Sequence, residues 1–194
     1  SSVNSRIGSD GGISFRNKII DGKFDFWYEN LSQSASGYGS DTMSLNEHSG
    51  STKLHSRQDL TIGVSLPCID VPTAKYFSRT VVASINGASN YVRKTWRIEG
   101  VRTFAGKKVR LSFHGKADGT KNIAVELQQN FGTGGGPSST VSTPVGLVNL
   151  TTTWSRKGVS IDVPSIDEKT IGTGLNDYIE IVVWFDAGST YAVR

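Results

Sequence analysis

The sequence predicts an all-β protein built as an antiparallel β-sandwich. Segments rich in β-branched and aromatic residues recur along the chain, with apolar residues at about every second position. Clusters of Gly, Asn, Asp, Ser and Pro separate these segments, as turns between strands require. No window carries the i, i+3, i+4, i+7 apolar spacing of an amphipathic helix. Many short strands without helices between them favour an antiparallel sandwich over a parallel α/β sheet.

The strands can be assigned in order along the chain. The clearest segments are 76–85, 90–98, 107–117, 121–131, 153–163 and 177–185, and weaker strands are expected at 24–28, 54–64 and 145–150. Residues 98–106 leave room for at most one helical turn. We interpret residues 1–13 as a flexible leader or a linker from a preceding domain, and residues 14–194 as one β-sandwich domain, whose closing strand is missing or comes from a neighbouring chain.

Alternation assigns the two sides of each strand. The side chains expected in the core are Val109, Leu111, Phe113, Ile123, Val125, Leu127, Ile179, Ile181 and Val183. Those expected to face outward are Arg110, Ser112, His114, Lys116, Glu126, Gln128 and Asn130. One side of each strand is therefore polar and accessible to solvent or ligand.

Composition limits the classes of function. The chain has 194 residues, 36% hydrophobic residues and a net charge of +4. Its single cysteine, Cys68, excludes an internal disulfide and a cysteine zinc cluster. His48, His55 and His114 lack metal-ligand spacing. No run approaches the roughly 20 apolar residues of a membrane span, so we expect no membrane insertion.

Charge is distributed unevenly along the chain. Residues 75–116 contain ten Lys or Arg against Glu99 alone, whereas residues 162–186 contain six acidic residues and one Lys. The basic block either attracts an anionic bacterial polysaccharide or the phosphates of lipopolysaccharide, or is neutralised by the acidic block on adjacent strands or subunits. No nucleic-acid reader motif accompanies it, so we expect no nucleic-acid partner.

Several motifs occur in a specific order, beginning with "NKIIDGKFDFW" and "YFSRTVV" and continuing with "FAGK", "QNFGTGG" and "TTTW". Over residues 17–189 the chain resembles a module of bacteriophage tail fibres and tailspikes, which is similar in plan to the jelly-roll carbohydrate-binding modules. This resemblance implies a jelly roll that binds host cell-surface glycan without catalysis during adsorption, located in the virion as a homotrimer. Two positions depart from the family, His114 in place of Trp and "DTMSL" at 41–45 in place of an Asp-Arg-Trp element.

The predicted glycan-binding residues combine hydrogen-bonding side chains with an aromatic platform. The polar group comprises His114, Glu126, Gln128 and Asn130, and the platform is Trp184 or Trp96. We expect Trp184 to be the more exposed of the two, because its neighbours on the same side are Tyr178 and Glu180. The neighbours of Trp96 are mostly apolar.

The segment at 19–27 admits two interpretations. We favour Phe24, Phe26 and Trp27 as a first strand that packs into the core, and the alternative is an exposed Trp27 that stacks on a sugar. Asp21 and Asp25 are candidate ligands for a structural calcium. The simpler interpretation is that Asp21 is a turn residue and Asp25 is a surface residue. No other cofactor is expected.

No catalytic motif is apparent in the sequence. A glycosidase needs two carboxylates at one site, and the sequence places none of Asp177, Glu180 or Asp186 beside Glu126. We therefore expect a binding module and no enzyme. Two alternatives remain open, a structural module that trimerises or caps the fibre without a ligand, and an accessory domain of a polysaccharide depolymerase.

Overall fold

The described chain consists of strands and the turns that join them. A computed structural model describes residues 17–27, 31–38, 44–61, 74–85 and 87–189, and these residues include no helix. The strands are β1 (Ser32–Gln33), β2 (Gly37–Tyr38), β3 (Leu45–Ser49), β4 (Ser51–Asp59), β5 (Tyr76–Ile85), β6 (Tyr91–Glu99), β7 (Lys108–Gly115), β8 (Lys121–Asn130), β9 (Val141–Leu150), β10 (Ser155–Asp162) and β11 (Tyr178–Ala187). Every pairing is antiparallel, which confirms the predicted all-β class.

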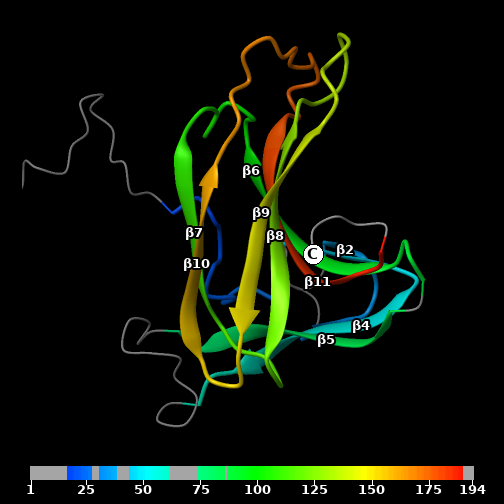
Figure 1. Ribbon diagram of the computed structural model, residues 1–194, viewed down its shortest axis with the longest axis vertical. Helices are drawn as coiled ribbons and strands as arrows, with labels where there is room; N and C mark the ends of the chain where they lie inside the picture. Colours follow the sequence, from blue (N-terminus) through cyan, green and yellow to red (C-terminus); the bar gives the residue numbers. More distant parts are fainter. Residues whose placement is uncertain (1–16, 28–30, 39–43, 62–73, 86, 190–194) are drawn as a thin grey trace, which may run out of the picture.

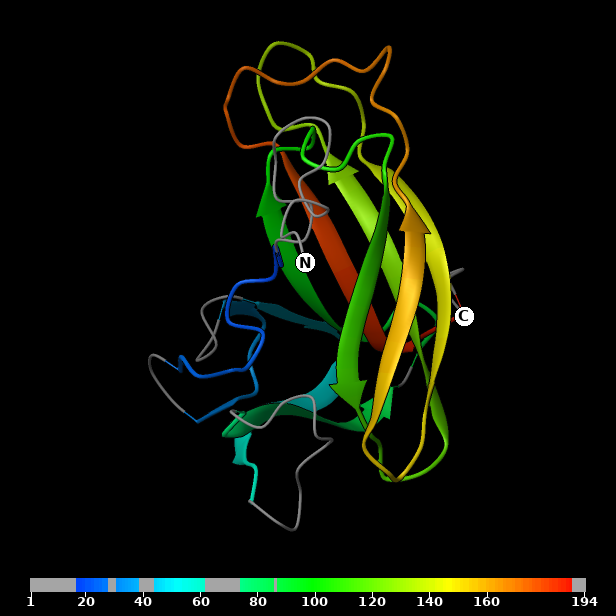
Figure 2. The same ribbon diagram turned by 90° about the vertical axis from the view of Figure 1, so that its left-hand side faces the viewer.

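A six-stranded sheet forms the main layer, in the order β2-β3-β6-β11-β8-β9. The pair β7–β10 lies over one face of this sheet and runs along its long direction (Figures 1 and 2). We call this covered face the inner face and the opposite one the outer face. The arrangement is sandwich-like, because apolar side chains of the two layers meet between them.

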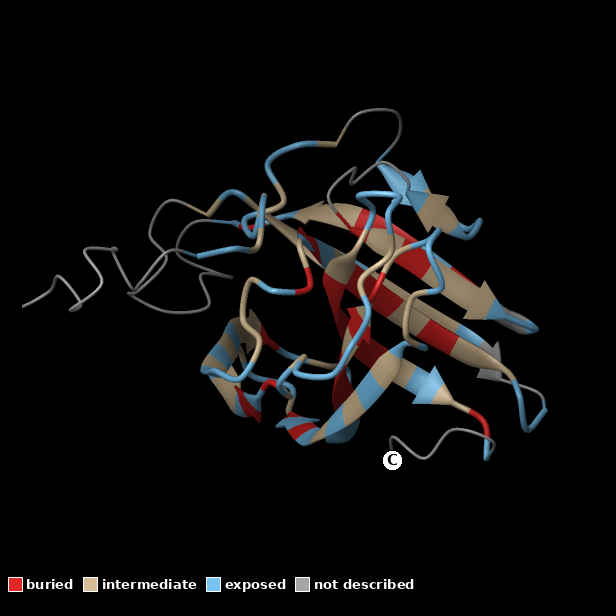
Figure 3. Ribbon diagram, turned by 90° about the horizontal axis from the view of Figure 1, so that it is seen from above, coloured by how far each residue is buried: buried red, intermediate tan, exposed pale blue. Residues whose placement is uncertain are grey.

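The core between these layers is built from the alternating residues of the middle strands. Buried side chains from β6, β8 and β11 pack with others from β10, and partly buried side chains of β7 complete the contact. The buried members include Ile98, Ile123, Val125, Leu127, Ile161, Ile179, Ile181 and Val183. Buried residues accordingly concentrate along the central strands, while loops and strand ends are exposed (Figure 3). The core side of the strands predicted at 107–117, 121–131 and 177–185 is as the sequence analysis expected.

A third sheet, β1-β4-β5, crosses one end of the sandwich (Figure 1). It contacts the larger sheet through His55 of β4, whose ring lies 6.2 Å from that of Phe185. Lys53 and His55 are buried here beside Lys94 of β6. Buried basic side chains were not expected from the sequence.

The six strongest strand predictions are confirmed within two or three residues at each end, and 145–150 belongs to the longer β9. The prediction for 54–64 overlaps β4, which ends at Asp59. Residues 98 and 99 end β6 and residues 101–106 form turns, without a helical turn. The predicted leader at 1–13 lies outside the described residues.

The predicted strand at 24–28 is wrong over its described residues. Residues 24–27 are irregular because the Asp21 carboxylate accepts the backbone N–H groups of Asp25 and Phe26, which folds the segment into a local turn. Phe24 has a positive φ of 59°, which no strand residue adopts. Phe26 is 68% exposed, so it does not pack into the core as expected, and Trp27 is only half-buried.

Candidate functional site

The outer face of the six-stranded sheet carries the side chains that alternate with the core. Strand register places Arg97 opposite Glu180, and Glu180 opposite Gln128, across three neighbouring strands. Side chains directly opposite each other in a sheet are close enough to interact. Three predicted polar residues, Glu126, Gln128 and Asn130, therefore lie on the same face as Trp184.

One half of this face combines an ion pair with two tyrosines. Arg97 Nε donates to Glu180 Oε1 at 2.8 Å, and the guanidinium carbon lies 4.4 Å from the ring centre of Tyr178 and 5.9 Å from that of Tyr38. Burial alone would lower the pKa of Arg97, but the hydrogen bond and the charge of Glu180 outweigh it and raise the pKa. Tyr38 is 56% exposed, so this cluster presents an accessible aromatic ring beside fixed donors and acceptors.

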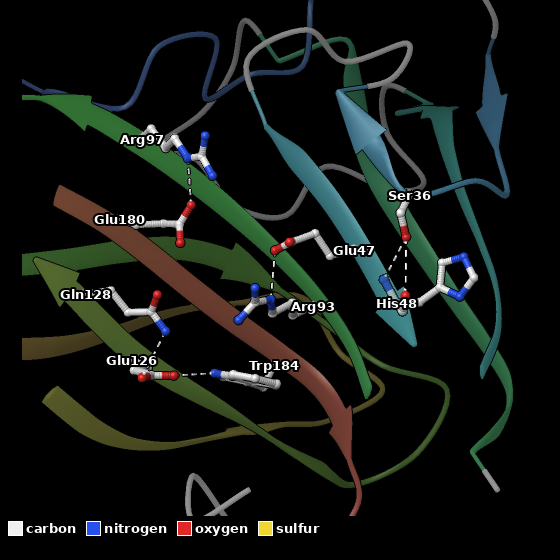
Figure 4. A network of polar contacts seen from close by, with 9 residues as sticks. All are labelled: Ser36, Glu47, His48, Arg93, Arg97, Glu126, Gln128, Glu180 and Trp184. Carbon is white, nitrogen blue, oxygen red and sulfur yellow. Dashed lines mark hydrogen bonds and ion pairs between the residues drawn. The ribbon is translucent and has the colours of Figure 1, made fainter. Parts of the chain in front are cut away.

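The middle of the outer face is a second network of polar contacts (Figure 4). Arg93 Nε donates to Glu47 Oε2 at 2.7 Å. Glu126 accepts from Trp184 Nε1 at 2.9 Å and from Gln128 Nε2 at 3.1 Å. Because these side chains hold one another in place, the partly exposed members of the network, Glu47, Arg93 and Gln128, are already oriented for a ligand.

The expectation that Trp184 is exposed is wrong, since the residue is only 4% exposed. Its side of the strand was predicted correctly, but longer neighbours cover the ring. The Arg93 guanidinium carbon lies 5.0 Å from the Trp184 ring centre, and Tyr91 meets the ring edge-on at 5.6 Å. Glu126 is likewise buried although it faces outward. Trp184 therefore stabilises the outer face and does not present an exposed ring on which a sugar could stack.

A shallow depression of about 720 Å³ lies at one end of the outer face. Ala124 and Trp184 contribute to its lining, together with Leu147 and Asn122 from the neighbouring part of the sheet and Asp186 at the end of β11. Leu147 is half-exposed, and Asn149 Nδ2 donates to Asn122 Oδ1 at 3.0 Å. The depression thus joins a small apolar surface to fixed amide and carboxylate groups, as ligand pockets of this size commonly do.

The remaining predicted site residues, His114 and Trp96, do not lie on the outer face. Both line a larger groove of about 1570 Å³ on the inner side, between β5, β7 and the segment 17–27. The structure therefore separates the six predicted residues into two groups on opposite sides of one sheet. The sequence analysis missed Arg97, Tyr38 and Leu147, although the alternation in "YVRKTWRI" already placed Arg97 opposite to Trp96.

The charge blocks meet in the folded chain. Arg97 of the basic block pairs with Glu180 of the acidic block, and Lys108 pairs with Asp162 at 3.2 Å. These pairs favour mutual neutralisation over a continuous basic field, at least where the two blocks are adjacent.

The structure places several of the acidic residues that the sequence analysis considered as catalytic or calcium-binding candidates. Register brings Glu126 and Glu180 together as diagonal neighbours, where Glu126 accepts a hydrogen bond from Trp184 Nε1 and Glu180 accepts one from Arg97 Nε. Asp21 accepts two backbone bonds in its turn, and no group of three or more His, Cys, Asp or Glu side chains suited to a metal occurs among the described residues. The calcium site at Asp21 and Asp25 stays a prediction.

Comparisons with protein-family models, with curated proteins and with solved structures found no match to this chain. Within the described part of the chain, no helix is long and apolar enough to cross a membrane.

Proposed function

We propose that this chain is a non-catalytic jelly-roll module that binds glycan through the outer face of its six-stranded sheet. The observation that carries the proposal is the combination of exposed apolar surface with oriented polar groups on that face. Leu147 and Tyr38 are exposed, while Asn122, Gln128 and Arg97 are held by hydrogen bonds or an ion pair. Sugar rings offer an apolar face for packing and hydroxyl groups for planar amide, carboxylate and guanidinium partners.

The proposed binding mode follows from this arrangement. One sugar unit sits in the depression against Leu147 and hydrogen-bonds to Asn122 and Asp186. Further units extend across the face toward Gln128 and the Arg97–Tyr38 pair. A polysaccharide fits such an extended surface better than a small molecule, because the polar groups are spread over several strands.

The biological setting we propose is that of the phage module that the sequence resembles. In this setting the chain is part of a homotrimeric tail fibre or tailspike in the virion, and it binds bacterial surface polysaccharide or lipopolysaccharide during adsorption. The depression and the networks support a binding role.

The experiment is a binding screen followed by matched variants. A panel of purified bacterial polysaccharides and lipopolysaccharides is tested by affinity electrophoresis, and each hit is titrated calorimetrically. We expect Leu147→Asp to weaken binding at least about tenfold, because it places a charge where a sugar ring packs. Leu54→Asp is the matched control, since Leu54 is also an exposed leucine on a strand but belongs to the β1-β4-β5 sheet.

Three results would contradict the proposal. Retention of no polysaccharide favours a structural module without a ligand. Equal binding by wild type and Leu147→Asp places the site elsewhere, and the groove that contains His114 and Trp96 is then the next surface to test. Release of reducing ends from a bound polysaccharide would show that the chain is an enzyme.

A further inference from the structure

The pair β7–β10 has a second face, which points away from the core. Val109 and Leu111 of β7 and Ile161 of β10 pack into the core, so the residues that alternate with them point outward. Register pairs these outward residues across the two strands, as it does Ser160 with Arg110. Figure 2 shows β7 and β10 at the front of the molecule. This face is therefore a solvent-facing surface of the sandwich.

The second face is strongly basic. Four of its outward side chains are Lys or Arg, and all four are exposed: Lys108, Arg110, Lys116 and Arg156. We call these four residues the basic strip. Asp162 is the one acidic residue among the described residues of this face, and it pairs with Lys108 at 3.2 Å. In the part of the chain that the structure describes, Arg110, Lys116 and Arg156 have no ion-pair partner, so the fold leaves most of the strip's charge unneutralised.

The middle of the strip depends on a glycine. Arg110 crosses to the neighbouring strand and lies over Gly158, since a Cβ placed on Gly158 would be 2.9 Å from Arg110 Nη2 and 3.2 Å from Arg110 Nε. The missing side chain at 158 therefore makes room for the guanidinium against the backbone of β10. A guanidinium can donate two parallel hydrogen bonds to one carboxylate, so the strip presents a group suited to that anion.

One end of the strip adds an aromatic ring. The backbone N–H of Ala117 donates to the carbonyl of Thr151 at 2.8 Å, which continues the pairing beyond β7 and brings Lys116 beside Trp154. Lys116 Nζ lies 5.6 Å from the Trp154 ring centre. The indole is half-buried, with the Phe77 ring edge-on to it at 5.2 Å. A partly exposed indole beside a cation suits a sugar ring that carries an acidic group.

The spacing of the cations indicates an extended partner. Arg110 and Lys116 are six residues apart, which is about 20 Å at roughly 3.3 Å per residue. A small anion cannot reach both side chains, whereas a polymer with acidic groups at intervals can. Surfaces that bind single-stranded nucleic acid add several aromatic rings on which successive bases stack. Among the described residues of this face Trp154 is the one aromatic ring, so the features favour an acidic polysaccharide.

We propose that the basic strip binds an acidic polysaccharide whose sugar units carry carboxylate groups. The outer face of the six-stranded sheet is less suited to this ligand, because Arg93 and Arg97 are already paired there with Glu47 and Glu180. The strip is thus a second binding surface, on the other layer of the sandwich. It does not depend on the glycan site proposed for the outer face.

The test is calorimetric titration of the full chain with polygalacturonate, with neutral dextran and with an oligothymidylate. We expect the wild type to bind polygalacturonate, with an affinity that falls as the salt concentration rises. The double variant Arg110→Gln/Arg156→Gln should bind at least about tenfold more weakly, because two charge-assisted contacts are lost. Its melting temperature should match that of the wild type, since both side chains are exposed.

Two control variants separate the strip from the rest of the surface. Arg102→Gln/Lys169→Gln removes the same charge from two exposed residues outside the strip and should bind polygalacturonate like the wild type. Leu147→Asp, which tests the outer face, should also leave this binding unchanged, so the two proposals can fail independently.

Four results would overturn the proposal. They are a wild type that does not bind polygalacturonate, an equal loss of affinity in the two double variants, tighter binding of the oligothymidylate than of polygalacturonate, and a loss in Leu147→Asp as large as that in Arg110→Gln/Arg156→Gln.

Discussion

His55 should make the protein sensitive to mild acid, and the reason lies in its surroundings. The side chain is fully buried between the β1-β4-β5 sheet and Phe185. Its Nδ1 lies 2.8 Å from Thr80 Oγ1, while its Nε2 has no hydrogen-bond partner within the described part of the chain. Burial lowers the pKa of His55 from 6.5 to about 2, and the positive charges of Lys94 and Lys53 add to this effect. The folded protein therefore holds His55 neutral.

The sign and size of the effect follow from proton linkage. Above pH 6.5 the imidazole is neutral in both the folded and unfolded states, so stability does not depend on it. Below pH 6.5 the unfolded state binds a proton that the folded state does not, so stability falls as the pH falls toward 2. At pH 5 the loss is about 2 kcal/mol, and this value depends on the unfolded pKa alone because the folded pKa lies far lower.

The assay is urea unfolding at pH 7.5 and pH 5, for the wild type and for His55→Asn. Asn retains a side-chain partner for Thr80 but cannot titrate. We expect the wild type to lose about 2 kcal/mol more than His55→Asn between the two pH values. Lys53→Met is the control, because it removes a neighbouring charge but leaves the imidazole buried, so its acid sensitivity should persist. Equal losses in the wild type and His55→Asn would refute the reasoning.

Three further predictions concern stability. Burial and the neighbouring Lys94 charge lower the pKa of Lys53 from 10.5 to about 8. The folded state therefore releases this proton at a lower pH than the unfolded state does, so the free energy of unfolding should rise between pH 8 and 10.5. Lys53→Met should abolish that rise, which urea unfolding at alkaline pH measures. Trp184→Ala should lower the free energy of unfolding by about 3–5 kcal/mol, because it leaves a cavity at a buried site and removes the hydrogen-bond donor to Glu126. A loss below about 1 kcal/mol in urea unfolding would instead indicate that the ring is exposed and available for stacking. Phe113→Ala should cost about 2–3 kcal/mol, less than for a fully buried ring because Phe113 is half-buried, and calorimetric melting measures it.

The sequence was most informative where one face of a strand is apolar throughout. Ile179, Ile181 and Val183 all lie on one face of β11, so both the strand and its core side could be predicted. The short strands β1, β2 and β3 carry no such alternation and depend on pairing with distant partners, as β3 does with β6. Local patterns cannot predict pairings of that kind.

Burial on the outer face was harder to predict, because the cover comes from other strands. Alternation correctly grouped Trp184 with Glu180, but the guanidinium that lies over its ring belongs to Arg93 on β6. Lys94 likewise shares one side of β6 with Trp96, and only the folded chain shows that it is buried there. A side chain's face can be read from its own strand, whereas its exposure depends on neighbours that are distant in sequence.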